Sequence, residues 1–194
     1  MDIIVEADEK DIAHFELTKG IMHLVDDTKQ KELLNYLKGH QKAVELGGSS
    51  MNAIRTLSQL GKKTCFAGMV SEDHYGDMIK SRLGELNIHH QLGTGEGGTG
   101  TCVILVTPDG ERTMNTSLGA SRMYGGEVIP HNEISESEVF HFCGYQWDTS
   151  EQKEGVKSAM ETAKKAHTKI SFDIADPFVV DANKEDLSHI IENH

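Results

Sequence analysis

Apolar residues recur along the chain with two periods, which predict strands and helices in alternation. Short apolar runs predict strands at 2–5, 43–46, 64–70, 139–143 and 169–175. Apolar residues three or four positions apart predict helices at 26–38, 49–60, 77–86 and 150–166, and a last helix from Asn183 or Asp186 onward. Strands that alternate with helices are typical of an α/β fold, in which helices cover both faces of a parallel sheet.

Residues 92–116 and residues 6–17 interrupt this alternation. In the first of these segments, residues 92–100 (LGTGEGGTG) are rich in glycine, and residues 101–107 and 112–116 flank a Pro-Asp-Gly-Glu connection. This arrangement predicts a β-hairpin, and because no helix follows it, the hairpin is expected to belong to a small antiparallel accessory sheet. Residues 6–17 mix acidic and apolar positions and predict strand and turn.

The stretch from Gly47 to Gly61, GGSSMNAIRTLSQLG, carries the most informative pattern. Its helix has an apolar stripe formed by Ala53, Ile54, Leu57 and Leu60. Ser49 or Ser50 is the expected N-cap, and Gly61 lies where a left-handed residue ends a helix.

Gly47 and Gly48 precede this helix and leave the backbone open to a ligand, because neither has a Cβ. Asn52 follows on the first turn, where its amide offers both donors and an acceptor. Such a set suits vicinal hydroxyls of a sugar as well as an anion. No Gly-Lys-Ser/Thr follows, so the stretch is not a phosphate-binding P-loop. A plain capped loop-to-helix junction is the alternative interpretation.

Composition narrows the function classes. The net charge of -12 argues against nucleic acid or an anionic membrane as the main partner. No apolar run reaches the roughly 20 residues that span a bilayer, and the acidic N-terminal residues lack a signal-peptide pattern. Cys65, Cys102 and Cys143 lie in apolar runs, so reduced, buried thiols in a cytoplasmic protein are expected. The histidine spacings favour no metal site.

Several segments together resemble one family. GGSSMNAIRTLSQLG is similar to the Gly-Gly/Asn signature of the PfkB, or ribokinase-like, carbohydrate and nucleoside kinases. CFAGMVSEDHYGDMIKSRLGELNI continues the match, and TGTCVILVTPDGERTMNTSLGAS looks like the lid hairpin of the adenosine-kinase-like branch. VFHFCGYQWDT and ISFDIADPF resemble its next two core strands. The resemblance implies a ribokinase-like α/β sandwich with a small antiparallel β lid, whose segments are approximately 2–18, 41–47 and 88–118.

The resemblance also implies a substrate site. The matching positions for binding a sugar are Asp2, Gly47, Gly48 and Asn52, and those for the lid side of the pocket are Cys102, Met114 and Thr116. No metal ligand is implied among them. Tyr145, Gln146 and Trp147 leave two interpretations open, an aromatic that stacks on a base or ordinary core packing.

The implied activity is phosphoryl transfer from MgATP to a primary hydroxyl of a nucleoside such as adenosine. The family's Gly-Ala-Gly-Asp segment, which supplies the general base, does not occur in the sequence, so no catalytic residue is assigned. Residues 1–194 are therefore expected to be a single kinase domain that is incomplete at both ends and inactive alone. The alternatives are a ribokinase- or fructokinase-like sugar kinase and a non-catalytic ligand-binding remnant, as a monomer or a lid-mediated dimer.

Overall fold

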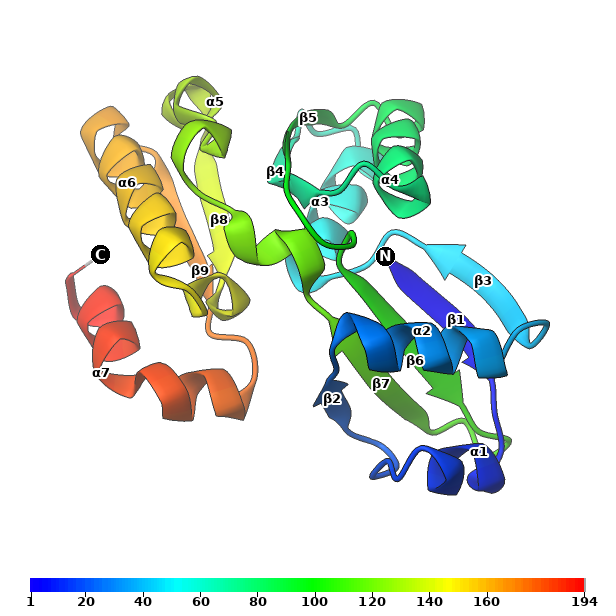
Figure 1. Ribbon diagram of the computed structural model, residues 1–194. Helices are drawn as coiled ribbons and strands as arrows, with labels where there is room; N and C mark the ends of the chain where they lie inside the picture. Colours follow the sequence, from blue (N-terminus) through cyan, green and yellow to red (C-terminus); the bar gives the residue numbers. More distant parts are fainter. Residues whose placement is uncertain (194) are drawn as a thin grey trace. The chain divides into compact units, whose positions relative to one another are not determined.

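The computed structural model describes residues 1–193 (Figure 1), which form two compact units. The first unit comprises Met1–Asn52, Val70–Glu85 and Thr94–Ser121, and the second comprises Ala53–Met69, Leu86–Gly93 and the described residues from 122 onward. Over the described part of the chain, no helix combines the length and the apolar composition that crossing a membrane requires.

The first unit is built on a five-stranded sheet with the order β2-β7-β6-β1-β3. Its strands are β1 (Asp2–Glu6), β2 (Met22–Leu24), β3 (Gln41–Glu45), β6 (Thr101–Val106) and β7 (Arg112–Ser117). The predicted β6–β7 hairpin is present and antiparallel, as is the β1–β3 pair. The β1–β6 and β2–β7 pairs are parallel, so the accessory sheet is mixed and not purely antiparallel.

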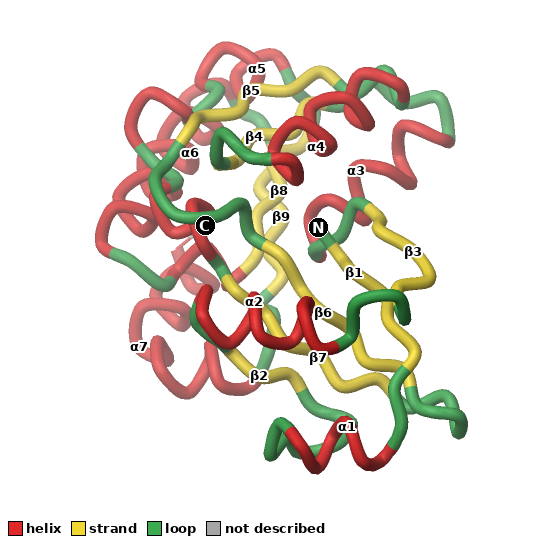
Figure 2. Tube along the Cα trace, turned by 45° about the vertical axis from the view of Figure 1, so that its right-hand side comes forward, coloured by secondary structure: helices red, strands yellow, loops and turns green. Residues whose placement is uncertain are grey.

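One face of this sheet packs against helices to form the core of the first unit. Two helices cover it, α1 (Glu9–His14) and α2 (Asp27–Tyr36), and α2 crosses the strands in both views (Figures 1 and 2). Ile3, Val5, Val103 and Leu105 are fully buried there, together with side chains from both helices. Because side chains alternate along a strand, the intervening residues point to the opposite face.

Helix α1 corrects the prediction of strand and turn for residues 6–17. Asp8 accepts hydrogen bonds from the backbone amides of Lys10 and Asp11 at 2.7 and 3.1 Å, and the Asp11 carboxylate accepts from the Asp8 amide at 2.8 Å. This reciprocal capping box stabilises a helix that is too short to show a clear apolar period.

The stretch from Gly47 to Gly61 forms α3 (Ser49–Gln59). Gly61 follows in the predicted left-handed conformation, with φ of 77°. The expected serine cap is wrong, because the helix already begins at Ser49 and the Gly48 carbonyl accepts from the Asn52 amide at 2.9 Å. The predicted apolar stripe is not buried either: Leu57 and Leu60 are 43% and 70% exposed, and Met51 is the buried residue of this helix.

The second unit contains two two-stranded sheets. Its strands are β4 (Cys65–Val70) with β5 (His89–Thr94), and β8 (Val139–Cys143) with β9 (Lys169–Asp173). The β8–β9 pair is parallel, as the alternation predicts, but β4 is mostly half-buried and not covered on both faces. The α-helices that lie wholly in this part are α5 (His131–Glu136), α6 (Ser150–Ala166) and α7 (Pro177–Asn193). Helix α3 passes from the first unit into the second after Asn52, and α4 (His74–Glu85) belongs to the first unit. The 3₁₀ helices of the described chain are η1 (Gly119–Met123), η2 (Gly126–Val128) and η3 (Gly144–Trp147).

Helix α6 matches its prediction. Thr149 caps it by accepting from the Gln152 amide at 3.2 Å, and its residues at three- and four-residue spacing, Val156, Ala159, Met160 and Ala163, are all buried. Helix α7 runs from Pro177, and a kink at Asn183, with φ of -132° and ψ of 25°, divides it into two segments. The predicted last helix from Asn183 or Asp186 is the segment after the kink, and an unpredicted segment from Pro177 precedes it. Proline is favoured in the first helical turn, where its missing N–H leaves no hydrogen bond unmade.

Trp147 settles one alternative left open by the sequence. It is 1% exposed within the core that α6 and α7 share, and its indole N–H donates to Asp186 at 2.9 Å. Core packing is therefore its role, whereas Tyr145 is 38% exposed and contacts the Phe178 ring.

Candidate functional site

Strand register brings four of the predicted site residues to the open face of the first unit's sheet. Asp2 pairs with Cys102, and Cys102 pairs with Thr116. Partners in register lie on the same face, so these three side chains form one row across β1, β6 and β7. Met114, two residues before Thr116, lies in the adjacent row. All four are half-buried, in contrast to the fully buried residues of the helix-covered face.

Gly47 contacts the Asp2 carboxylate directly. A Cβ built on Gly47 would lie 2.0 Å from Cγ of Asp2 and 2.1 Å from each carboxylate oxygen. Real side chains never approach so closely, and the carboxylate therefore occupies its position only because residue 47 has no side chain. The two residues come together because β3, which ends at Glu45, pairs with β1 so that Asp2 lies opposite Glu45.

Gly48 and Asn52 follow Gly47 along the chain, Gly48 directly before α3 and Asn52 in its first turn. Gly48 has φ of 101°, a conformation that strains any residue with a Cβ, although nothing lies within 4 Å of the position that its Cβ would occupy. The Asn52 side chain is exposed. All seven predicted residues therefore lie in the first unit.

The electrostatics of the row are visible at Cys102. Burial raises the pKa of its thiol, and the negative charge of Asp2 raises it further, while a hydrogen bond with Thr116 acts in the opposite direction. The net shift is upward, so Cys102 is a neutral thiol at neutral pH. The row thus combines one carboxylate with neutral polar groups.

Sequence reasoning missed four residues that share this face. Ile4 pairs with Ile104, Ile104 with Met114, and Met114 with Met22, which forms an apolar row beside the polar one. Leu24 pairs with Thr116 and adds an apolar side chain at the end of the polar row. Counting two residues on from Asp2 and Cys102 identifies Ile4 and Ile104. Strand β2 is too short for its pattern to reveal Met22 and Leu24.

The expectation that all thiols are buried is wrong in part. Cys143 is buried, whereas Cys65 and Cys102 are half-buried, and none of the three forms a disulfide. Burial, followed by the charge of Glu133, raises the pKa of Cys65 to about 11. Cys65 lies in the second unit and is an internal reference for chemistry at Cys102.

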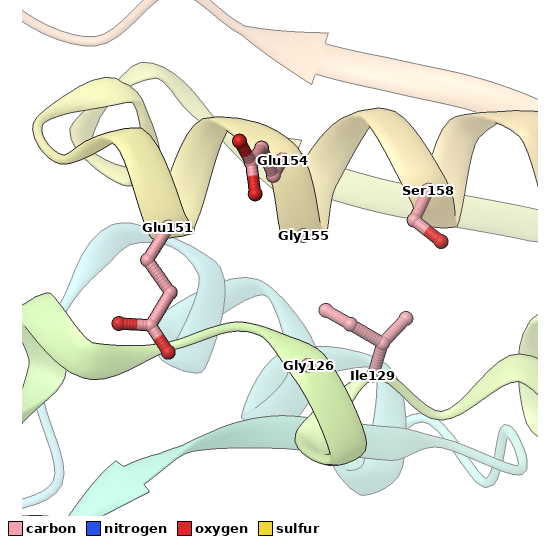
Figure 3. A pocket seen from close by; sticks show the side chains of 6 residues that line it. All are labelled: Gly126, Ile129, Glu151, Glu154, Gly155 and Ser158. Carbon is pink, nitrogen blue, oxygen red and sulfur yellow. The ribbon is translucent and has the colours of Figure 1, made fainter.

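The second unit has a hollow of its own, of about 350 Å³ (Figure 3). Its lining residues are Gly126, Ile129, Glu151, Glu154, Gly155 and Ser158. Glu151, Glu154 and Ser158 come from the exposed side of α6. The carboxylates of Glu151 and Glu154 repel a phosphate group, so this hollow does not suit a nucleoside triphosphate.

Comparison with known proteins adds to this geometry. The family model described as pfkB family carbohydrate kinase matches residues 18–194. The crystal structure of adenosine kinase from Sinorhizobium meliloti superposes with a TM-score of 0.85 and 28% identity, over 97% of this chain and 58% of that chain. An uncharacterized sugar kinase, YegV, of Escherichia coli K12 is 27% identical over 55% of this chain and 33% of its own length. Probable fructokinase-2 of Arabidopsis thaliana is 27% identical over 66% of this chain and 40% of its own length.

Proposed function

Since the chain belongs to the pfkB family of carbohydrate kinases, we propose that it supplies the acceptor-binding half of a kinase that phosphorylates a primary hydroxyl of a nucleoside such as adenosine. The contact between Gly47 and the Asp2 carboxylate carries the proposal. A carboxylate on a half-buried sheet face accepts hydrogen bonds from two neighbouring hydroxyls, and such charge-assisted bonds are the stronger ones. The matched region covers 33% of the length of YegV and 40% of the length of probable fructokinase-2. The activity of a longer protein is therefore part of the proposal.

The apolar row favours a nucleoside over a free sugar. Ile4, Ile104 and Met114 lie beside the polar row, and methionine adapts to flat aromatic surfaces. A purine covers such a row, whereas a hexose would leave apolar surface facing its hydroxyls. A polar row for the ribose and an apolar row for the base therefore match the two parts of a nucleoside.

Phosphoryl transfer would proceed from MgATP to the hydroxyl that the site orients. Catalysis of this reaction depends mainly on positioning and on neutralising charge on the transferred group. We assign the general base to no residue of this chain. Among residues 1–193, no three His, Cys, Asp or Glu side chains lie together as a metal site. The contribution of this chain is to bind and orient the acceptor.

Calorimetric titration with adenosine, ribose and fructose tests the acceptor class. We expect adenosine to bind at least 10-fold more tightly than either sugar, because only adenosine occupies both rows. Fructose binding that is tighter than adenosine binding would favour the sugar-kinase alternative, which the similarity to probable fructokinase-2 supports. ATP turnover measured on the same samples, with each acceptor, is expected to be nil or very weak.

Alkylation of Cys102 tests the location of the site. Saturating adenosine is expected to slow the reaction of Cys102 with iodoacetamide at least 10-fold, because Cys102 lies in the row between Asp2 and Thr116. The rate at Cys65 should stay unchanged, which provides the control within one sample. The rate for each thiol is measured by mass spectrometry, from the fraction of its tryptic peptide that is alkylated at successive times. Protection of Cys65 without protection of Cys102 would place the ligand elsewhere.

A further inference from the structure

The loop that leads into β6 is rich in glycine, yet it is held by one carboxylate. Asp73 lies just before α4 and accepts hydrogen bonds from the Thr99 amide at 2.8 Å and from the Thr99 hydroxyl at 2.7 Å. It also accepts from the Gly76 amide at 2.8 Å, which caps α4. Asp73 therefore joins the start of a helix to the end of a loop that glycine leaves intrinsically flexible.

Ser71 completes the attachment. Its backbone amide donates to the Thr99 hydroxyl at 2.9 Å, and its own hydroxyl lies 2.9 Å from the Gly95 carbonyl and 2.7 Å from the Gly97 carbonyl. Ser71 and Thr99 are 4% and 5% exposed. Both hydroxyls are hydrogen-bonded in a buried setting, where an unmade bond is costly.

Backbone packing fixes the other side of the loop. The Gly98 carbonyl accepts from the Ala120 amide at 2.9 Å, and a Cβ on Gly119 would lie 1.9 Å from that carbonyl oxygen. A Cβ on Gly76 would lie 2.2 Å from the Ser71 carbonyl oxygen. The loop therefore has one tightly packed path into β6.

This path leads directly into the strand that carries Cys102. Strand β6 begins at Thr101, two residues after Thr99, and a slip of one residue would turn Cys102 to the opposite face. The bonds at Thr99 hold the chain two residues before the strand in which Cys102 lies between Asp2 and Thr116.

We propose that Asp73 is a positioning residue for acceptor binding, which acts through Thr99 to hold β6 in register beside Asp2. This proposal rests on the proposed function for its ligand. Burial alone raises the pKa of Asp73, but the hydrogen bonds from Thr99 and Gly76 lower it, and the pKa lies below its ordinary value. The carboxylate is accordingly ionised at neutral pH and accepts from all its donors.

Three substitutions test the proposal by adenosine titration. Asp73→Asn and Thr99→Val, which removes the hydroxyl, are each expected to raise the Kd for adenosine about 10-fold, the effect of losing about 1.4 kcal/mol. Thr99→Ser keeps the hydroxyl and should bind adenosine within about 2-fold of the wild type. Asp77→Asn removes a carboxylate from the exposed side of the first turn of α4 and is the matched control.

The pH profile of Cys102 alkylation gives a readout that needs no ligand. If β6 loses its register in Asp73→Asn, Cys102 leaves its buried position beside Asp2, its pKa falls, and the profile shifts to lower pH while that of Cys65 stays fixed. An unchanged Cys102 profile in Asp73→Asn, or equal Kd values for Thr99→Val and Thr99→Ser, would overturn the proposal. If the wild type binds no acceptor, the proposed function fails, and the alkylation profile still decides whether Asp73 positions β6.

Discussion

Replacing Asp2 by asparagine is expected to weaken adenosine binding by about 100-fold or more. The carboxylate offers two oxygens to hydroxyl donors, and a hydrogen bond to a charged group contributes about 1.5–3 kcal/mol. The amide keeps one acceptor without the charge, so about 3 kcal/mol of binding free energy is lost, and each 1.4 kcal/mol is a factor of ten. The measurement is the Kd from calorimetric titration of the two proteins.

The control for this substitution is Asp77→Asn, which makes the same chemical change at an exposed position of α4. It should leave the Kd for adenosine unchanged. The melting temperature of both variants should stay close to that of the wild type, which separates a loss of binding from a loss of folding. Equal adenosine affinity in Asp2→Asn and the wild type would remove Asp2 from the site.

Replacing Gly47 by alanine is expected to weaken adenosine binding by a similar factor, about 100-fold. The new methyl group would lie 2.0 Å from Cγ of Asp2, so the carboxylate must move away from its position. The displacement should also cost about 1–3 kcal/mol of unfolding free energy, as overpacking does elsewhere. Denaturant unfolding and adenosine titration measure the two effects separately.

A double-substitution cycle shows whether Gly47 acts through Asp2. Once Asp2 is replaced by alanine, Gly47→Ala should weaken adenosine binding no further, because the displaced group is gone. Gly84→Ala is the matched glycine control: nothing lies within 4 Å of its Cβ position, and it lies inside α4. It should stabilise the protein by about 0.5–1 kcal/mol and leave binding unchanged. Additive effects of Gly47→Ala and Asp2→Ala would contradict the direct contact.

The periodic parts of the fold could be predicted from sequence. The Pro-Asp-Gly-Glu connection between two strand-like runs predicts the β6–β7 hairpin, and the spacing of Val156, Ala159 and Met160 predicts α6 together with its buried face. Both depend on contacts that are local in the chain or on a long, strong apolar period. The short helix α1 has neither, and its signal, Asp8 with Asp11, concerns hydrogen bonds and not hydrophobicity.

Other features depend on contacts between distant segments. The period of α3 predicts that Leu57 and Leu60 are buried, but burial also requires a partner, and both residues are exposed. The predicted last helix from Asn183 or Asp186 follows the kink at Asn183 in α7. The segment of α7 that begins at Pro177 was not predicted, although proline suits a first helical turn.

The residues of the candidate site could likewise be predicted where local motifs identify them, and not where contacts between distant segments do. Asp2, Gly47 and Asn52 could be chosen by the resemblance of short motifs, but the contact between Asp2 and Gly47 follows from the pairing of β1 with β3. Asp73 could not be found, because its role lies in bonds to Thr99, which is 26 residues away along the chain. The apolar row of Ile4, Ile104 and Met114 likewise appears only when three strands are in register.

The central claim is that the acceptor binds on the open face of the five-stranded sheet. A ¹³C-methyl NMR titration of the methionines with adenosine tests this claim most directly. Met22 and Met114 are paired on that face, whereas Met160 is 2% exposed in the core of the second unit. The account predicts that the Met22 and Met114 methyl signals shift and saturate at the calorimetric Kd while the Met160 signal stays in place. Adenosine binding that leaves the Met22 and Met114 signals unmoved would contradict it.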